Sequence, residues 1–251
     1  MAQNAVAREG RRPLLVEFTG LPGAGKTTIA RAVLPELARA GYRCVVPGRL
    51  GDPPEAVPEG SSVWLGKLGT LSGLISVSLR NPVVFFRALA YAWSAAPRSL
   101  VTVRRMKTLL CRLSVIEGAM DADCDLVVLD QGLIQNVWSI TAAGDPPKDE
   151  RGLRPLVERL LSGFSPLLVL VDIDAERAVE RIGDRPTMDS RFDRMPIARA
   201  AALLGRHGAV LERIVRCAAE LPTIRCLRVD GGRPPTANVP LILDEIRNAR
   251  R

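Results

Sequence analysis

The stretch Gly20-Leu21-Pro22-Gly23-Ala24-Gly25-Lys26-Thr27 matches G-x-x-x-x-G-K-[ST], the pattern of a phosphate-binding loop, or P-loop. Glycines let the backbone curl so that successive N–H groups point inward at phosphate oxygens. The helix that begins at the end of the loop adds the positive end of its dipole. In such a loop we expect Lys26 to reach the β- and γ-phosphates and the hydroxyl of Thr27 to bind Mg²⁺.

The residues on either side of this loop agree with the motif. Leu14–Phe18 is a short, mostly apolar run that predicts a strand entering the loop, and a helical pattern follows from Lys26 until Gly41. The pattern G-x-G-x-x-G does not occur, so a dinucleotide-binding loop is not predicted. The residues expected to hold ATP are Gly20, Pro22, Gly23, Ala24, Gly25, Lys26, Thr27 and Thr28.

The composition favours one cytoplasmic domain spanning residues 1–251. The chain has 251 residues, is 47% hydrophobic and contains no long polar linker, so it can build one large core. Five scattered cysteines without a C-x-x-C pair, and a single histidine, His207, argue against a zinc site and suit a reducing compartment. No apolar core follows the basic residues near the N-terminus, so no secretion signal is predicted.

The net charge of +8 rests on arginine, with 31 arginines against four lysines. These arginines are dispersed and lack interleaved aromatic residues, so nucleic acid is not favoured as a partner. Arginine also suits enzymes that handle phosphate, because its planar fork binds oxyanions at two points. The sequence is compatible with a homodimer.

Apolar runs alternate with helical patterns along the whole chain, which predicts a parallel sheet covered by helices on both faces. We therefore expect an α/β, three-layer sandwich of the P-loop NTPase type with a five-stranded parallel sheet. After the first strand, the predicted strands are Arg43–Val46, Leu126–Asp130, Leu167–Asp172 and Ile224–Val229. The predicted helices are 26–40, three between 63 and 122 separated at Pro82 and Pro97, one from after Asp130 to about Ala142, Leu153–Leu161, Ala175–Ile182, Ile197–Glu220 and Thr236–Arg247.

The segment 63–122 is an inserted helical region that is unusually apolar. Its runs Leu68–Leu79 and Val83–Ala96 resemble membrane segments in composition. However, Pro82 separates the two runs, Arg87 interrupts the second, and neither reaches about 20 clean apolar residues. Core helices or helices on the acceptor side of an active site are therefore favoured over a membrane partner.

Two acidic residues end predicted strands. Asp130 follows a buried apolar strand, at the edge of the sheet where α/β proteins bind ligands. We expect it to bind Mg²⁺ through water or to take the proton of an acceptor, with capping of the next helix as the structural alternative. Asp172 is a weaker candidate, because Asp172-Ile173-Asp174 is typical of a turn and a helix start.

The segment from Phe18 to Gly41, the strand ending at Asp130 and a later arginine-rich loop together resemble the thymidylate kinase-like and deoxynucleoside kinase-like P-loop kinases. The resemblance implies that a helix with spaced arginines leads into a lid, at about 183–195, which closes over ATP. It also implies that Leu227–Gly231 forms the last strand and a loop flanking adenine. With Lys26 from the motif and Asp130 from its strand end, the residues predicted to be catalytic are Lys26, Asp130, Arg181, Arg185 and Arg191.

The sequence departs from that family at one place. The family carries an acid followed by arginine after the central strand, whereas this chain has Asp130-Gln131-Gly132. Arg104 or Arg105, on the preceding predicted helix, could replace the missing arginine, or both could be surface charges. The lid arginines likewise have the alternative of a solvated basic loop.

Two functions are compatible with these residues. The first is an ATP-dependent kinase that transfers the γ-phosphoryl group to a small molecule, with a nucleoside or nucleotide as the preferred class of acceptor. The second is a P-loop NTPase that hydrolyses ATP or GTP as a switch for a protein or membrane partner. No Asn-Lys-x-Asp motif for guanine is present, which disfavours the second.

Overall fold

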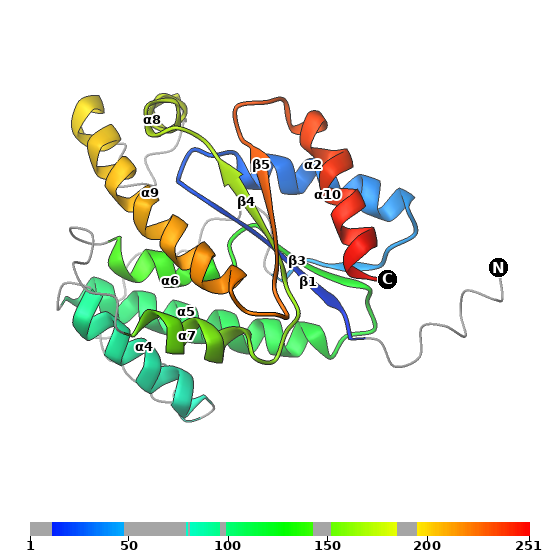
Figure 1. The fold of residues 1–251 in the computed structure, drawn as a ribbon, viewed down its shortest axis with the longest axis horizontal. Coiled ribbons are helices and arrows are strands. Elements are labelled where there is room, and N and C mark those ends of the chain that lie inside the picture. The colour runs from blue at the N-terminus through cyan, green and yellow to red at the C-terminus, as the bar shows by residue number, and fades with distance from the viewer. Residues whose placement is uncertain (1–11, 48–78, 80, 96–98, 143–151, 185–194) are drawn as a thin grey trace, which may run out of the picture.

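Five strands form one sheet in which all neighbours are parallel, in the order β2-β3-β1-β4-β5 (Figure 1). The structure, a computed structural model, describes residues 12–47, 79, 81–95, 99–142, 152–184 and 195–251. The strands are β1 (Leu14–Gly20), β2 (Cys44–Val45), β3 (Leu126–Leu129), β4 (Leu167–Asp172) and β5 (Arg225–Asp230).

Helices cover both faces of this sheet (Figure 1). One face packs against α2 and α10, and the other packs against α4 to α9. The helices described are α2 (Lys26–Arg39), α4 (Pro82–Ala95), α5 (Leu100–Met120), α6 (Leu133–Thr141), α7 (Leu153–Leu161), α8 (Ala175–Gly183), α9 (Ile197–Ala219) and α10 (Pro235–Ala249).

The predicted fold class is confirmed: a five-stranded parallel sheet lies between two layers of helices. Two of the helices predicted between 63 and 122 are α4 and α5. The remaining one falls, apart from Leu79, outside the described residues. Strand β2 is shorter than expected, with Cys44 and Val45 alone in the ladder. Within the described ranges, no helix is both long enough and apolar enough to cross a bilayer.

Strand β1 runs through the middle of the sheet and is buried at all seven positions. Leu14, Val16 and Phe18 belong to the core under α2 and α10, whereas Leu15 belongs to the core on the other side. Because side chains alternate along a strand, Glu17 points to the same side as Leu15. A carboxylate therefore enters the core beneath the layer of α4 to α9.

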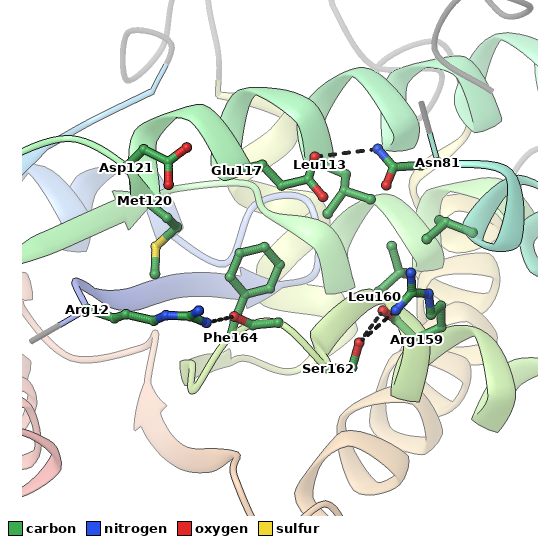
Figure 2. A pocket seen from close by; sticks show the side chains of 12 residues that line it. Arg12, Asn81, Leu113, Glu117, Met120, Asp121, Arg159, Leu160, Ser162 and Phe164 are labelled. Atoms are coloured by element: carbon green, nitrogen blue, oxygen red, sulfur yellow. Dashed lines mark hydrogen bonds between the residues drawn. The ribbon is translucent and has the colours of Figure 1, made fainter. Parts of the chain in front are cut away.

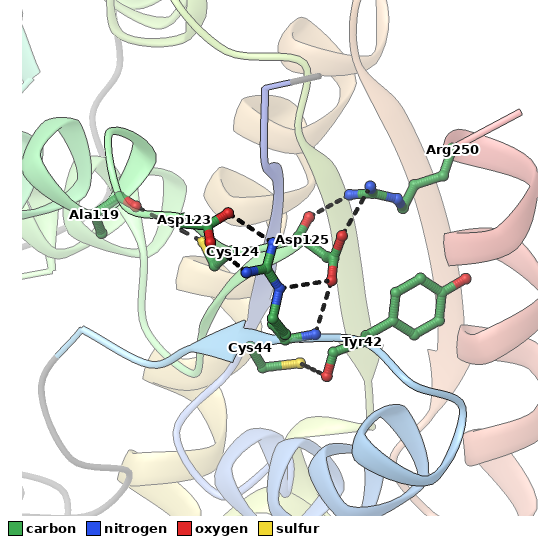
Figure 3. Close-up of polar contacts among 8 residues, drawn as sticks. Tyr42, Cys44, Ala119, Asp123, Cys124, Asp125 and Arg250 are labelled. Atoms are coloured by element: carbon green, nitrogen blue, oxygen red, sulfur yellow. Dashed lines mark hydrogen bonds and ion pairs between the residues drawn. The ribbon is translucent and has the colours of Figure 1, made fainter. Parts of the chain in front are cut away.

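Asp125, directly before β3, connects the start of that strand to the residue before β2 and to Arg250 near the C-terminus (Figure 3). This carboxylate accepts a hydrogen bond from the backbone N–H of Arg43 at 2.9 Å, and lies 3.3 Å from Nη2 of Arg250, just after α10. Its side chain is only 6% exposed. Asp123 also pairs with the Arg43 guanidinium, but its side chain is 87% exposed.

This difference in burial predicts unequal effects of two substitutions that both remove a carboxylate next to Arg43. Asp125→Ala should lower the free energy of unfolding by about 2 kcal/mol, because it leaves an N–H and two cations without their buried acceptor. Asp123→Ala should lower it by less than about 1 kcal/mol, because an exposed ion pair is screened by water. Urea unfolding of both variants measures the difference, and equal losses would contradict this account.

Candidate active site

The P-loop joins the end of β1 to the start of α2, and its glycines are required by its geometry. Gly23 and Gly25 have φ angles of 87° and 94°, a region that other residues rarely adopt. A Cβ on Gly23 would also lie 2.3 Å from the carbonyl oxygen of Ala178 in α8. The loop is therefore packed directly against α8, and its curled backbone leads into the N-terminus of α2.

Lys26 is the first residue of α2 and is buried. Its Nζ donates hydrogen bonds to the carbonyl oxygens of Gly20 and Leu21, both at 2.9 Å. The amino group thus lies inside the curl of the loop, where the sequence motif places the β- and γ-phosphates of a nucleotide.

The two residues predicted to bind metal lie in contact. The hydroxyl of Thr27 donates to Oδ2 of Asp130 at 3.1 Å, bringing the start of α2 to the end of β3. A hydroxyl and a carboxylate are oxygen ligands of the kind that Mg²⁺ prefers, so this pair fits that ion. No cluster of three or more histidine, cysteine or acidic side chains suited to a metal occurs in the described residues.

The capping alternative for Asp130 is not what the structure shows. Helix α6 has Gly132 at its N-cap with no side-chain cap, and the Asp130 carboxylate is turned to Thr27. The lower rank of Asp172 agrees with its surroundings, since it is half exposed and pairs with Arg228 at 2.7 Å. Asp174 caps α8 by accepting from the backbone N–H of Arg177, as the turn-and-helix pattern predicted.

Arg181 lies beside the P-loop, on the last turn of α8. Its Nη1 donates to the carbonyl oxygen of Gly231 at 2.7 Å and lies 3.7 Å from the position of a Cβ on Gly25. The other two arginines predicted to be catalytic, Arg185 and Arg191, lie outside the described residues, as does most of the predicted lid.

Glu17 organises this region, although no motif in the sequence marks it. The side chain is completely buried, and its two oxygens accept from the backbone N–H groups of Leu133 at 2.8 Å and Gln135 at 3.1 Å. The carboxylate from β1 therefore takes the place of a side-chain cap at the N-terminus of α6. Burial raises the pKa of Glu17 to about 7, against the lowering effect of these backbone hydrogen bonds.

Helix α6 is also joined to the P-loop through Gln135. Its Oε1 accepts from the hydroxyl of Thr19 and from the backbone N–H of Gly20, both at 3.1 Å. Glu17 and Gln135 together fix the end of β1 to the first turn of α6. Since Asp130 lies two residues before the N-cap Gly132, the same contacts hold Asp130 relative to the phosphate loop.

The glycine in Asp130-Gln131-Gly132 follows from the same arrangement. A Cβ on Gly132 would lie 2.3 Å from Cδ of Glu17, in space that the carboxyl group fills. The signal was present in the sequence, because Glu17 is the one ionisable residue in a strand expected to be buried on both faces. A partner for such a group had to be supplied by a neighbouring element.

A cleft of about 600 Å³ opens beside the P-loop. Its lining combines P-loop residues with side chains of α2, of α6 and of the turn before α6: Lys26, Thr27, Arg31, Gln131, Gln135 and Asn136 are among them. The described lining includes neither Arg104, which is exposed, nor Arg105, which donates to the carbonyl of Ser139. Arg31 is the cation at this wall that the sequence analysis did not single out.

A second hollow of about 550 Å³ lies at the carboxyl ends of β4 and β5, on the other side of the P-loop. Arg177 and Gly232 contribute to its lining. The neighbouring Gly231 lies so close to the P-loop that a Cβ there would be 2.5 Å from the carbonyl oxygen of Ala24. The two hollows therefore flank the phosphate loop.

A third cavity, of about 310 Å³, lies at the opposite end of the strands, where β1 and β4 begin (Figure 2). Its polar side chains contact groups within the cavity wall: Asn81 donates to Glu117, and Arg159 contacts Ser162. Parallel sheets bind ligands at the carboxyl ends of their strands, which this cavity does not adjoin. The candidate site is therefore the cleft at the P-loop.

Comparison with solved structures agrees with this architecture. The chain is similar to a deoxyadenosine kinase from M. mycoides solved with bound dATP, with a TM-score of 0.53 and 13% sequence identity. The similarity covers 93% of this chain and 99% of the other. The chain thus has the fold of that P-loop kinase. No protein-family model matches the chain, and no curated protein matches its sequence.

The contact between Gly132 and Glu17 predicts that Gly132→Ala destabilises the protein by about 1–3 kcal/mol, because the added methyl group overlaps a buried carboxyl group. Gly118→Ala is the matched control. Gly118 lies in α5 with open space around it, so alanine there should stabilise by about 1 kcal/mol. Thermal unfolding of both variants gives the comparison, and a stable Gly132→Ala protein would contradict the packing described.

The raised pKa of Glu17 predicts a pH-dependent stability. Between its ordinary value of 4.5 and about 7, the folded chain keeps a proton that the unfolded chain releases. Stability from this group is therefore present at low pH and is lost as pH rises through about 7. The stability of the natural chain minus that of Glu17→Gln should fall by up to about 3 kcal/mol between about pH 5 and pH 8. A difference that rises with pH would mean that the carboxylate is held ionised.

Proposed function

We propose that this protein is a phosphotransferase that moves the γ-phosphoryl group of ATP to a small molecule, with a nucleoside or nucleotide as the acceptor. The observation that supports it most is the contact between Thr27 and Asp130 at 3.1 Å, beside Lys26 and at the mouth of a cleft. The P-loop, the two residues that would hold Mg²⁺ and the cleft that would take the acceptor thus lie next to one another, at the carboxyl ends of the strands. The solved neighbour, a deoxyadenosine kinase, is consistent with this class of reaction.

The two hollows that flank the P-loop suit the two substrates. The hollow at the ends of β4 and β5, near Arg177 and Gly232, would take the base of ATP, with its phosphates in the P-loop. The cleft on the α6 side would take the acceptor, where the amides of Gln131 and Asn136 offer donors and acceptors suited to a nucleobase or sugar.

In the reaction, an oxygen of the acceptor attacks the γ-phosphorus and the bond to the bridging oxygen of ADP breaks. Lys26 and Arg181 lie where they would neutralise the charge on the phosphates. Thr27 and Asp130 would hold Mg²⁺, which neutralises phosphate oxygens when bound. Asp130 either serves the ion alone or also takes the proton that the acceptor loses.

The proposal extends to Arg185 and Arg191, which follow Arg181 in the sequence. Arginines at this place would stabilise the charge of the transferring group and help to exclude water. Their replacement by alanine should lower kcat and leave the melting temperature nearly unchanged. A lower melting temperature with unchanged kcat would assign them to structure instead.

Lys26→Ala and Asp130→Asn test the site itself. Each should lower kcat by about 10²-fold or more, because each removes charge or proton acceptance at the transferring group. Lys107→Ala is the control, since Lys107 is a half-buried lysine of α5 and not among the cleft residues. Rates are measured by ADP release with saturating Mg·ATP, and thermal unfolding verifies that each variant folds. Full activity in Lys26→Ala would refute the assignment.

Dependence on an acceptor separates a kinase from a hydrolytic switch. ATP consumption should rise at least about tenfold when the correct nucleoside or nucleotide is added, and phosphate should appear on that compound rather than in solution. A panel of nucleosides, nucleotides and sugars, with products identified by mass spectrometry, measures this. Hydrolysis at the same rate with every addition would support the P-loop NTPase alternative.

A further inference from the structure

The outward face of α4 is apolar along its length. Leu79, Val83, Phe86, Leu89 and Trp93 are 77%, 49%, 65%, 39% and 64% exposed. Leu79 lies just before α4, and the spacing of the other four residues places them on one side of the helix, opposite its buried residues. We call these five residues the α4 face.

Helix α5 continues this surface. Leu100 and Val101, at its start, are 60% and 46% exposed, and an apolar groove of about 420 Å³ runs between the two helices. Together with the α4 face they make up seven of the ten large hydrophobic side chains that are exposed among the described residues. Such clustering on the outside of a protein marks a surface that meets something apolar. Figure 1 shows α4 at the lower left edge of the molecule.

The charged residues of the segment that carries this surface have one sign. Residues 60–116 contain no aspartate or glutamate, although these make up 27 of the 251 residues in the chain. The same segment contains eight basic residues: Lys67, Arg80, Arg87, Arg98, Arg104, Arg105, Lys107 and Arg112. Of these, Arg87 and Arg104 are exposed on α4 and α5 themselves.

This charge distribution discriminates between candidate partners. A second copy docked through the same face would bring like cations together, with no carboxylate from residues 60–116 to pair them. An anionic lipid surface offers the complement to both features, because phosphate groups pair with the arginines while the interface accepts apolar side chains. Tryptophan and phenylalanine are well suited to that depth.

We infer that the α4 face, with Leu100 and Val101, docks the protein on an anionic membrane surface. The side chains of Phe86 and Trp93 enter the interface, and Arg87 and Arg104 lie at the level of the headgroup phosphates. The protein lies on the bilayer rather than across it. The phosphate-binding cleft is formed by other elements and stays accessible to soluble compounds.

Sedimentation of the full chain with vesicles tests this docking. The chain should bind vesicles of phosphatidylcholine with phosphatidylglycerol at least about tenfold more strongly than vesicles of phosphatidylcholine alone, and salt should weaken the binding. Phe86→Ser and Arg87→Glu should each weaken it several-fold. The control is Leu241→Ser, which removes a side chain of similar exposure (50%) on α10 and should bind as the natural chain does.

Tryptophan fluorescence locates the contact. The chain has three tryptophans, so the measurement is made in a Trp64→Phe background. In that background Trp93 is exposed whereas Trp138 is only 4% exposed, so anionic vesicles should shift the emission to shorter wavelength through Trp93. In the same background, Trp93→Phe should lose the shift and still sediment with the vesicles. A shift that persists in this variant would place the contact elsewhere and overturn the inference.

Two further results would overturn it. Equal binding to neutral and anionic vesicles, or none to either, would remove the role of charge. A mass that doubles with concentration in light scattering, and that Phe86→Ser returns to the monomer value, would make the α4 face an interface between two copies of this chain. Melting temperatures of all variants are compared, so that lost binding is not mistaken for unfolding.

Discussion

The contact between the Glu17 carboxylate and the start of α6 is the one on which the region around the P-loop depends. A buried carboxylate is costly unless its oxygens are hydrogen-bonded, and here the N–H groups at the start of α6 supply that compensation. Those N–H groups would themselves lack partners, because Gly132 cannot cap the helix. Two unfavourable groups from distant parts of the sequence therefore satisfy one another.

The consequence is a fixed position of α6, and of the turn that begins at Asp130, relative to the strand that enters the P-loop. Gln135 adds a second connection by accepting from Thr19 and Gly20. The turn Asp130-Gln131-Gly132 has its glycine because Glu17 fills the adjoining space. The cleft beside this turn has Arg31 in its wall.

Periodicity and the P-loop motif predicted the order of strands and helices well, because both are local properties of the sequence. The alignment of Thr27 with Asp130 followed from a general rule, since parallel strands present their carboxyl ends at one edge. The role of Glu17 could not be predicted in the same way. It depends on which helix packs over that position of β1, a tertiary contact between residues more than a hundred positions apart. For the same reason, the hydrogen bond from Arg105 to the carbonyl oxygen of Ser139 could not be predicted from the sequence.

The contact between Asp125 and Arg250 has a consequence for synthesis on the ribosome. Asp125, the residue before strand β3, is translated 125 residues before Arg250, the cation that pairs with it. Strand β5 and helix α10, which complete the edge and one face of the sheet, are also late. This contact therefore cannot form until Arg250 has left the ribosome, and a nascent chain that still lacks α10 leaves part of one apolar face of β1, β3 and β4 uncovered in the meantime.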